Sequence, residues 1–180
     1  LAGLLQSQGH LEEAVPLFRE SLEICRAVFG DRHPRTLASI SNMAGALHDQ
    51  GKLDDAEALY REDLEACRAA FDGHHPQLLA SINAMAGLLH DKGRLDEAAA
   101  LYREALAASR ALLGDCHKET LASTSNMAGL LHDQGRLDEA EPLYRESLNA
   151  CRATIGDRHP QTLASMSALA QVLHDQRKIG

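Results

Sequence analysis

The chain has 180 residues, of which 44% are hydrophobic, and it carries a formal net charge of −8. This length allows one domain or two, and the apolar content is enough for a core. The negative charge and the lack of any Lys and Arg cluster argue against nucleic-acid binding. No stretch approaches about 18 uninterrupted apolar residues, and the first residues lack a signal-peptide pattern. We therefore expect a soluble, intracellular protein of the cytoplasm without membrane contact.

Residues 1–33 begin a helical pattern. An apolar stretch over residues 1–8 predicts the end of a truncated helix, which Gly9 stops, and a second helix is expected to start near Leu11. Gly9 is the first of four glycines that recur every 42 residues, followed by Gly51, Gly93 and Gly135. The sequence is therefore an internal repeat.

Residues 34–75 show one complete repeat. Its first half predicts a helix over residues 34–50, because apolar residues follow helical spacing there: Leu37, Ile40, Met43, Ala44 and Leu47. The second half shows the same spacing from Leu53 onward and predicts a helix over residues 53–71, followed by a turn at Asp72-Gly73. We call these two elements helix A and helix B.

The same pattern continues to the end of the chain. A helices are expected near residues 34, 76, 118 and 160, and B helices near residues 11, 53, 95 and 137. With the truncated first helix this makes nine. The repeats are expected at about 1–33 in part, 34–75, 76–117, 118–159 and 160–180 in part, within a single domain of residues 1–180. Because one hairpin cannot bury its own apolar stripe, neighbouring hairpins must stack into an all-α solenoid.

Both ends of the chain fall inside the repeat pattern. The first residue is Leu1 and not Met, and the last helix A, expected to end near Gln176, has no helix B after it. We therefore expect a piece of a longer protein. The last helix should expose an apolar flank, and self-association through the truncated ends is a further expectation.

A family resemblance rests on the residues that define the repeat. They are Asn42-Met43-Ala44, Leu47, Gln50-Gly51, Leu53, Ala56, Leu59-Tyr60-Arg61 and Leu64. This pattern resembles the tetratricopeptide repeat across nearly the whole chain. The 42-residue period and the connector Gly30-Asp31-Arg32-His33-Pro34 are similar to the kinesin light chain subtype. The resemblance implies a right-handed superhelix whose concave surface is lined by A helices and accepts a peptide or a partner helix.

Matching to the family's repeat also implies which residues face that groove. The expected peptide-groove residues are Ser41, Asn42, Gly45, His48, Asp49, Asn83, Gly87, His90, Asp91, Ser125, Asn126, Gly129, His132, Asp133, Ser167, Gln171, His174 and Asp175. Alanines accompany them at Ala38, Ala80, Ala84, Ala122, Ala164 and Ala168. The resemblance implies that Asn42 and Asn126 hydrogen-bond the backbone of a bound peptide.

Three of these candidates are glycines inside helices. Gly45, Gly87 and Gly129 occupy positions where glycine costs about 1 kcal/mol relative to alanine. Either neighbouring A helices approach closely at these positions, or the backbone of a ligand does. The sequence leaves both explanations open.

A row of histidines recurs with an aspartate beside each, as in His48 with Asp49. Equivalent positions on stacked helices lie roughly 10 Å apart, too far to converge on one metal ion. We therefore expect a structural or partner-contacting row and no metal. The aspartates should make the groove rim acidic, so a partner that is neutral or basic there is expected.

Asp63 stands on the packed side of helix B, where other repeats have Ser21, Ala105 and Ser147. A buried carboxylate is costly without a partner, so a wet interface or an unrecognised pairing is expected, with a functional role as the third alternative. The four cysteines show no metal-binding spacing, and the three that recur at one helical position lie too far apart to pair. We expect free thiols.

These features favour a protein–protein interaction scaffold that holds a peptide or partner helix in its groove. The alternative is a structural spacer or self-assembly segment without a groove ligand. The sequence has no Gly-rich phosphate loop and no G-x-S-x-G element, so neither an enzyme nor a cofactor is expected.

Overall fold

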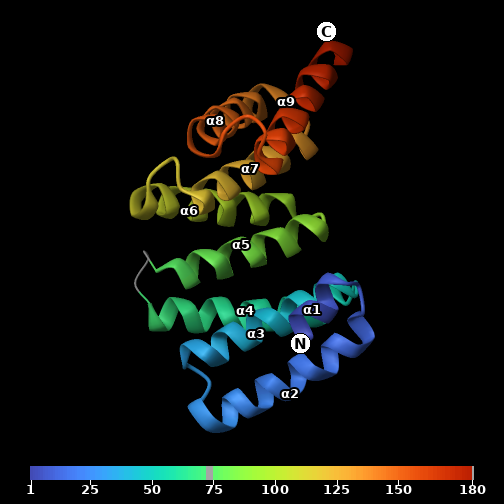
Figure 1. Cartoon of the computed structure of the whole chain (residues 1–180), viewed down its shortest axis with the longest axis vertical. Helices are drawn as coiled ribbons and strands as arrows, with labels where there is room; N and C mark the ends of the chain where they lie inside the picture. Colours follow the sequence, from blue (N-terminus) through green and yellow to red (C-terminus); the bar gives the residue numbers. More distant parts are fainter. Residues whose placement is uncertain (72–74, 180) are drawn as a thin grey trace. The chain divides into compact units, whose positions relative to one another are not determined.

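The computed structural model describes residues 1–71 and 75–179, and within these ranges it contains nine helices and no strand (Figure 1). The helices are α1 (Ala2–Ser7), α2 (Leu11–Phe29), α3 (Pro34–Asp49), α4 (Leu53–Ala70), α5 (Pro76–Asp91), α6 (Leu95–Leu113), α7 (Lys118–Asp133), α8 (Leu137–Ile155) and α9 (Pro160–Ile179). The odd-numbered helices are the A helices and the even-numbered ones are the B helices. The all-α fold predicted from the repeat is confirmed.

A glycine turn makes each A helix fold back into its B helix. At the end of α3, Gly51 has φ of 77°, a left-handed conformation that residues with a Cβ rarely adopt. The Lys52 amide donates to the Leu47 carbonyl at 2.9 Å, which satisfies one of the last carbonyls of the helix. Since α4 begins at Leu53, the two helices form a tight hairpin.

The connector between repeats is held by a histidine and a threonine. His33 caps α3, because its Nδ1 accepts a hydrogen bond from the Arg35 amide at 3.1 Å. Thr36 then donates from Oγ1 to the Gly30 carbonyl at 2.7 Å. Equivalent histidine caps start α5, α7 and α9. The predicted turn at Asp72-Gly73 lies outside the described residues.

The chain divides into two compact halves, residues 1–92 and 93–180. In the N-terminal half, α3 packs against α2, α4 and α5, and its apolar stripe forms the core: Leu37 and Ile40 are completely buried. In the C-terminal half, α7 packs against α6 and α8, and α8 packs against α9. The boundary falls inside the predicted repeat 76–117, and the single-domain prediction stays a prediction.

The last helix differs from the predicted one in length. It runs to Ile179 and not to about Gln176, because Arg177 occupies the position where the other repeats have a stop glycine. Leu163 and Met166 on this helix are 51% and 37% exposed, whereas the equivalent Leu37 and Ile40 of α3 are fully covered. The predicted apolar flank is therefore present on α9.

Candidate functional site

All eighteen predicted groove residues lie on A helices, and none of them is buried. The exposed ones are Asn42, Asp49, Asp91, Asn126, Asp133, Ser167, Gln171 and His174. The others are half-buried: Ser41, Gly45, His48, Asn83, Gly87, His90, Ser125, Gly129, His132 and Asp175. Each of them is thus open to solvent to some degree.

A pocket of about 260 Å³ lies between α3 and α5 in the N-terminal half. Its lining residues come from three helices: Pro34, Ala38, Ser41 and Asn42 from α3, Asp63 from α4, and Gln77, Ala80 and Ser81 from α5. The amide of Gln77 donates to the Pro34 carbonyl at 3.2 Å and so links the two A helices beside the pocket. The pocket brings the predicted residues Ser41 and Asn42 together with a buried carboxylate.

An equivalent pocket of about 340 Å³ lies between α7 and α9 in the C-terminal half. It is lined by Ala122, Ser125, Asn126, Tyr144, Gln161, Ala164, Ser165 and Ala168. Six of these positions lie 84 residues after members of the first pocket, which is two repeat lengths. At the position of Asp63 this half has Ser147, whose hydroxyl is hydrogen-bonded to that of Ser125 at 3.1 Å. The two halves therefore share one pocket design, but the repeat position that places Asp63 in the lining of the first pocket places no residue in the lining of the second.

The mid-helix glycines lie above tyrosine hydroxyl groups. A Cβ built on Gly45 would be 3.5 Å from the Tyr60 hydroxyl, and one on Gly129 would be 3.5 Å from that of Tyr144. These are ordinary contact distances, so an alanine would fit at both positions. Glycine at these two positions is therefore not required by a close approach of neighbouring A helices.

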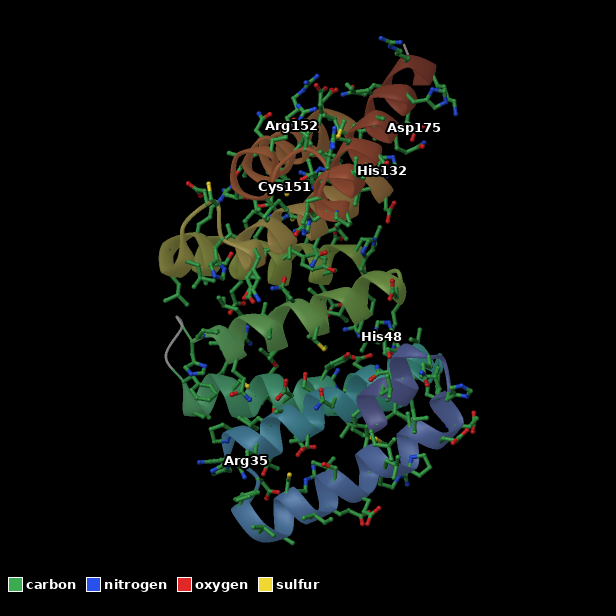
Figure 2. All side chains as sticks on the ribbon, in the orientation of Figure 1. Arg35, His48, His132, Cys151, Arg152 and Asp175 are labelled. Carbon is green, nitrogen blue, oxygen red and sulfur yellow. The ribbon has the colours of Figure 1, made fainter. Side chains whose placement is uncertain are left out.

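The histidine row links successive A helices. The Nε2 atom of His48 on α3 donates to Asp91 on α5 at 2.7 Å, and that of His132 on α7 lies 3.0 Å from Asp175 on α9 (Figure 2). In the first repeat Gln6 takes the place of the histidine and donates to Asp49 at 2.7 Å. The hydrogen bond from Gln171, followed by that from His132, lowers the pKa of Asp175. Of the two readings predicted for the row, these contacts support a structural role.

Asp63 is the most deeply buried charged side chain of the site, with 2% of its surface exposed. Burial raises the pKa of its carboxyl group to about 6, the Ser81 hydroxyl and the Cys67 thiol partly oppose this shift, and the charge of Glu62 adds to it. The thiol of Cys67 lies 3.7 Å from Oδ1. Asp63, for which the sequence predicted a wet interface or an unrecognised pairing, lies in the lining of a pocket. No ion pair with Asp63 is found in residues 1–71 and 75–179.

Seven pocket residues were not among the predicted groove residues: Pro34, Asp63, Gln77, Ser81, Tyr144, Gln161 and Ser165. A signal for the serines exists in the sequence, because Ser39, Ser81, Ser123 and Ser165 recur every 42 residues. Their partners identify the role of the position, since Ser39 donates to the Cys25 sulfur at 3.2 Å and Ser165 lies 3.9 Å from that of Cys151. Ser39 and Ser165 thus both face the helix B before them.

Three further observations concern chemistry that the site could carry. All four cysteines, Cys25, Cys67, Cys116 and Cys151, are free thiols. Across the described part of the chain, no group of three His, Cys, Asp or Glu side chains is arranged to hold a metal ion. None of the helices in that part combines the length and apolarity needed to cross a membrane.

Comparison with known proteins decides the family. A model of the tetratricopeptide repeat matches residues 1–62, 36–111 and 119–179. The chain belongs to the tetratricopeptide repeat family. Tetratricopeptide repeats are generally protein-interaction scaffolds and bind proteins or peptides. No curated protein matches the sequence.

Solved structures place this tetratricopeptide repeat protein near the kinesin light chain-like subtype. Nearly identical, kinesin light chain-like TPR repeats from Podosopora anserina share 27% identity with it. Two crystal structures of those repeats match this chain, a variant form with a TM-score of 0.86 and a second structure with a TM-score of 0.85. Each match covers 99% of this chain and 84% of the other. BtubC (BKLC) from P. vanneervenii has the same fold, with 20% identity and a TM-score of 0.85 over 98% of this chain and 70% of its own. The fold is thus a TPR-type solenoid of helical hairpins.

Proposed function

We propose that this chain is a protein-interaction scaffold whose A helices bind a peptide or a partner helix. One observation supports this most directly: both halves have the same pocket between neighbouring A helices, with an exposed asparagine, Asn42 or Asn126, in its lining. An asparagine side chain offers two donors and an acceptor to the backbone of a bound segment. Neither asparagine has a hydrogen-bond partner in the described part of the protein, so each is available to a ligand.

The proposal includes a partner that is neutral or basic where it meets the groove. Asp49 and Asp91 are exposed on the A helices of the N-terminal half, as Asp133 is in the C-terminal half. The carboxylates of Asp49, Asp91 and Asp175 also accept hydrogen bonds from neighbouring A helices. Anionic segments would meet like charge along this surface.

The test is binding of the purified chain to an immobilised peptide library that contains both charge signs. We expect specific peptides of neutral or positive charge, and we expect the variant with Asn42→Ala and Asn126→Ala to lose most of them. The control is Asn149→Ala, which removes an exposed asparagine from helix B and should leave binding unchanged. If no specific peptide binds, or if the double variant binds the same peptides equally well, the groove proposal is wrong.

A structural spacer or self-assembly segment is the second candidate. The observation in its favour is the exposed apolar flank of α9 at Leu163 and Met166. Contiguous exposed apolar surface is a common feature of association sites. Its expected marker is association that depends on protein concentration.

A further inference from the structure

The pocket between α3 and α5 has a carboxylate that the protein itself does not neutralise. Asp63 lines the pocket, yet the groups near its carboxyl there are the neutral Ser81 hydroxyl and the Cys67 thiol, 3.7 Å from Oδ1, and no cation pairs with it in the described ranges. The one arginine on α3 is engaged elsewhere, because Arg35 lies over the ring of Phe29 at 5.2 Å. A buried charge without a partner is costly, so this arrangement calls for an explanation.

The pocket between α7 and α9 shows that the fold does not require this carboxylate. There the same position is Ser147, which is satisfied by its hydrogen bond to Ser125. The remaining repeats have Ser21 and Ala105 at this position. The acid is therefore a property of one pocket and not of the repeat.

Other groups in the α3–α5 pocket are also unsatisfied acceptors. The Ser81 hydroxyl is buried and lies close enough to Asp63 to lower the pKa of that carboxyl, yet it makes no hydrogen bond of normal geometry. The side chains of Ser41 and Asn42 line the same pocket and form no hydrogen bonds in the described structure. A primary ammonium group carries three N–H donors and no acceptor, which matches a carboxylate surrounded by hydroxyl and amide oxygens.

From this juxtaposition we propose that the α3–α5 pocket binds the ε-ammonium group of a lysine from the partner peptide, with Asp63 as its counter-ion. Lysine fits better than arginine, since the thiol of Cys67 already occupies Oδ1 and a guanidinium fork prefers both oxygens of a carboxylate. The lysine ammonium group is a compact charge on a flexible four-carbon stem, so it can reach into the pocket and contact a single carboxylate oxygen of Asp63. This inference rests on the proposed groove function and names one residue of its ligand.

The test uses the whole chain and a defined probe, N-acetyl-lysine methylamide, followed by amide NMR shifts. We expect saturable shifts at Ser41, Asn42 and Ser81, with a dissociation constant of roughly 1 to 10 mM for so small a ligand. The variants Asp63→Asn and Asp63→Ser should weaken binding by about tenfold or abolish it, since each removes the charge that holds the probe. The norleucine analogue, which has the stem without the charge, should give no saturable shift.

The second pocket supplies a matched control in the same molecule. Ser125, Asn126 and Ser165 should show no saturable shifts with the lysine probe, and Ser147→Asp should create them. The proposal is overturned if Asp63→Asn binds the probe as the unaltered chain does, if norleucine binds equally well, or if the lysine probe gives no saturable shift. Preferential binding of the arginine analogue would overturn the choice of lysine.

The two proposals fail in distinguishable ways. If library peptides bind through Asn42 and Asn126 but require no lysine and ignore Asp63→Asn, the groove function stands and the lysine pocket is wrong. If the lysine probe occupies the pocket while no library peptide binds, the pocket is an amine site and the groove function is wrong.

Discussion

The carboxyl group of Asp63 has a pKa of about 6, raised from 3.8 mainly because burial disfavours its charged form. Between these two values the folded chain holds a proton that the unfolded chain has released. Stability therefore falls as pH rises through this window, and the contribution of the neutral acid is complete only below pH 3.8. Besides burial, Ser81, Cys67 and Glu62 act on the pKa of this carboxyl. Nearby Tyr60 has its own pKa raised to about 12 by burial, and further by the charges of Asp49 and Asp63.

Replacing Asp63 by serine, the residue of two other repeats, should stabilise the chain at neutral pH. The expected gain in the free energy of unfolding at pH 7.5 is roughly 2 to 3 kcal/mol, because the ionised carboxylate is no longer buried. Below pH 3.8 the gain from this source should vanish. Urea denaturation at both pH values measures the difference, and Asp55→Ser, an exposed change on the same helix, is the control. An equal gain at both pH values would show that charge burial is not the cause.

At the scale of helices, side-chain contacts join the helices of one repeat to those of the next. The bond from His48 to Asp91 joins α3 to α5, and Arg26 on α2 pairs with Glu62 on α4 at 2.5 Å, so A and B helices are both linked across repeats. Arg110 and Glu146 form the same pair between α6 and α8. Partly exposed pairs of this kind each contribute about 0.2 to 1 kcal/mol.

The role of the histidine row can be tested by exchanging His48. His48→Ala should lower the free energy of unfolding by about 1 kcal/mol, because it removes the bond to Asp91. His48→Gln should cost about 0.5 kcal/mol or less, since Gln6 makes the equivalent bond to Asp49 in the first repeat. The control is His174→Ala, because His174 is exposed and has no polar partner in the described structure. Chemical denaturation measures all three, and an equal loss for glutamine and alanine would contradict the hydrogen-bond explanation.

The sequence was sufficient to predict the helices, because each of their boundaries has a local cause. Gly51 ends α3 and Pro34 begins it, and the departure at α9 follows from Arg177 in place of a glycine. The pockets could be predicted only in part. Asn42 was found from the repeat pattern, whereas Asp63 and Ser81 reach the same pocket from two other helices, and only packing determines that.

At the scale of the whole molecule, the exposed apolar flank of α9 should govern association. Leu163 and Met166 occupy positions that are buried elsewhere, and covering them would remove apolar surface from water. We expect sedimentation equilibrium to show association that increases with protein concentration. The variant with Leu163→Ser and Met166→Ser should be more monomeric, while Ala170→Ser, an exposed change on the same helix, should have no effect. A chain that stays monomeric at all concentrations would argue against the self-assembly alternative.

The histidine row also gives the array a polarity. The helix α3 carries both the acceptor Asp49 for the preceding A helix and the donor His48 for the following one. A copied repeat therefore brings one donor and one acceptor in the correct order, and both of its new junctions are satisfied without any other change. A repeat that lacked the aspartate would instead leave the donor of the A helix before it without its carboxylate partner.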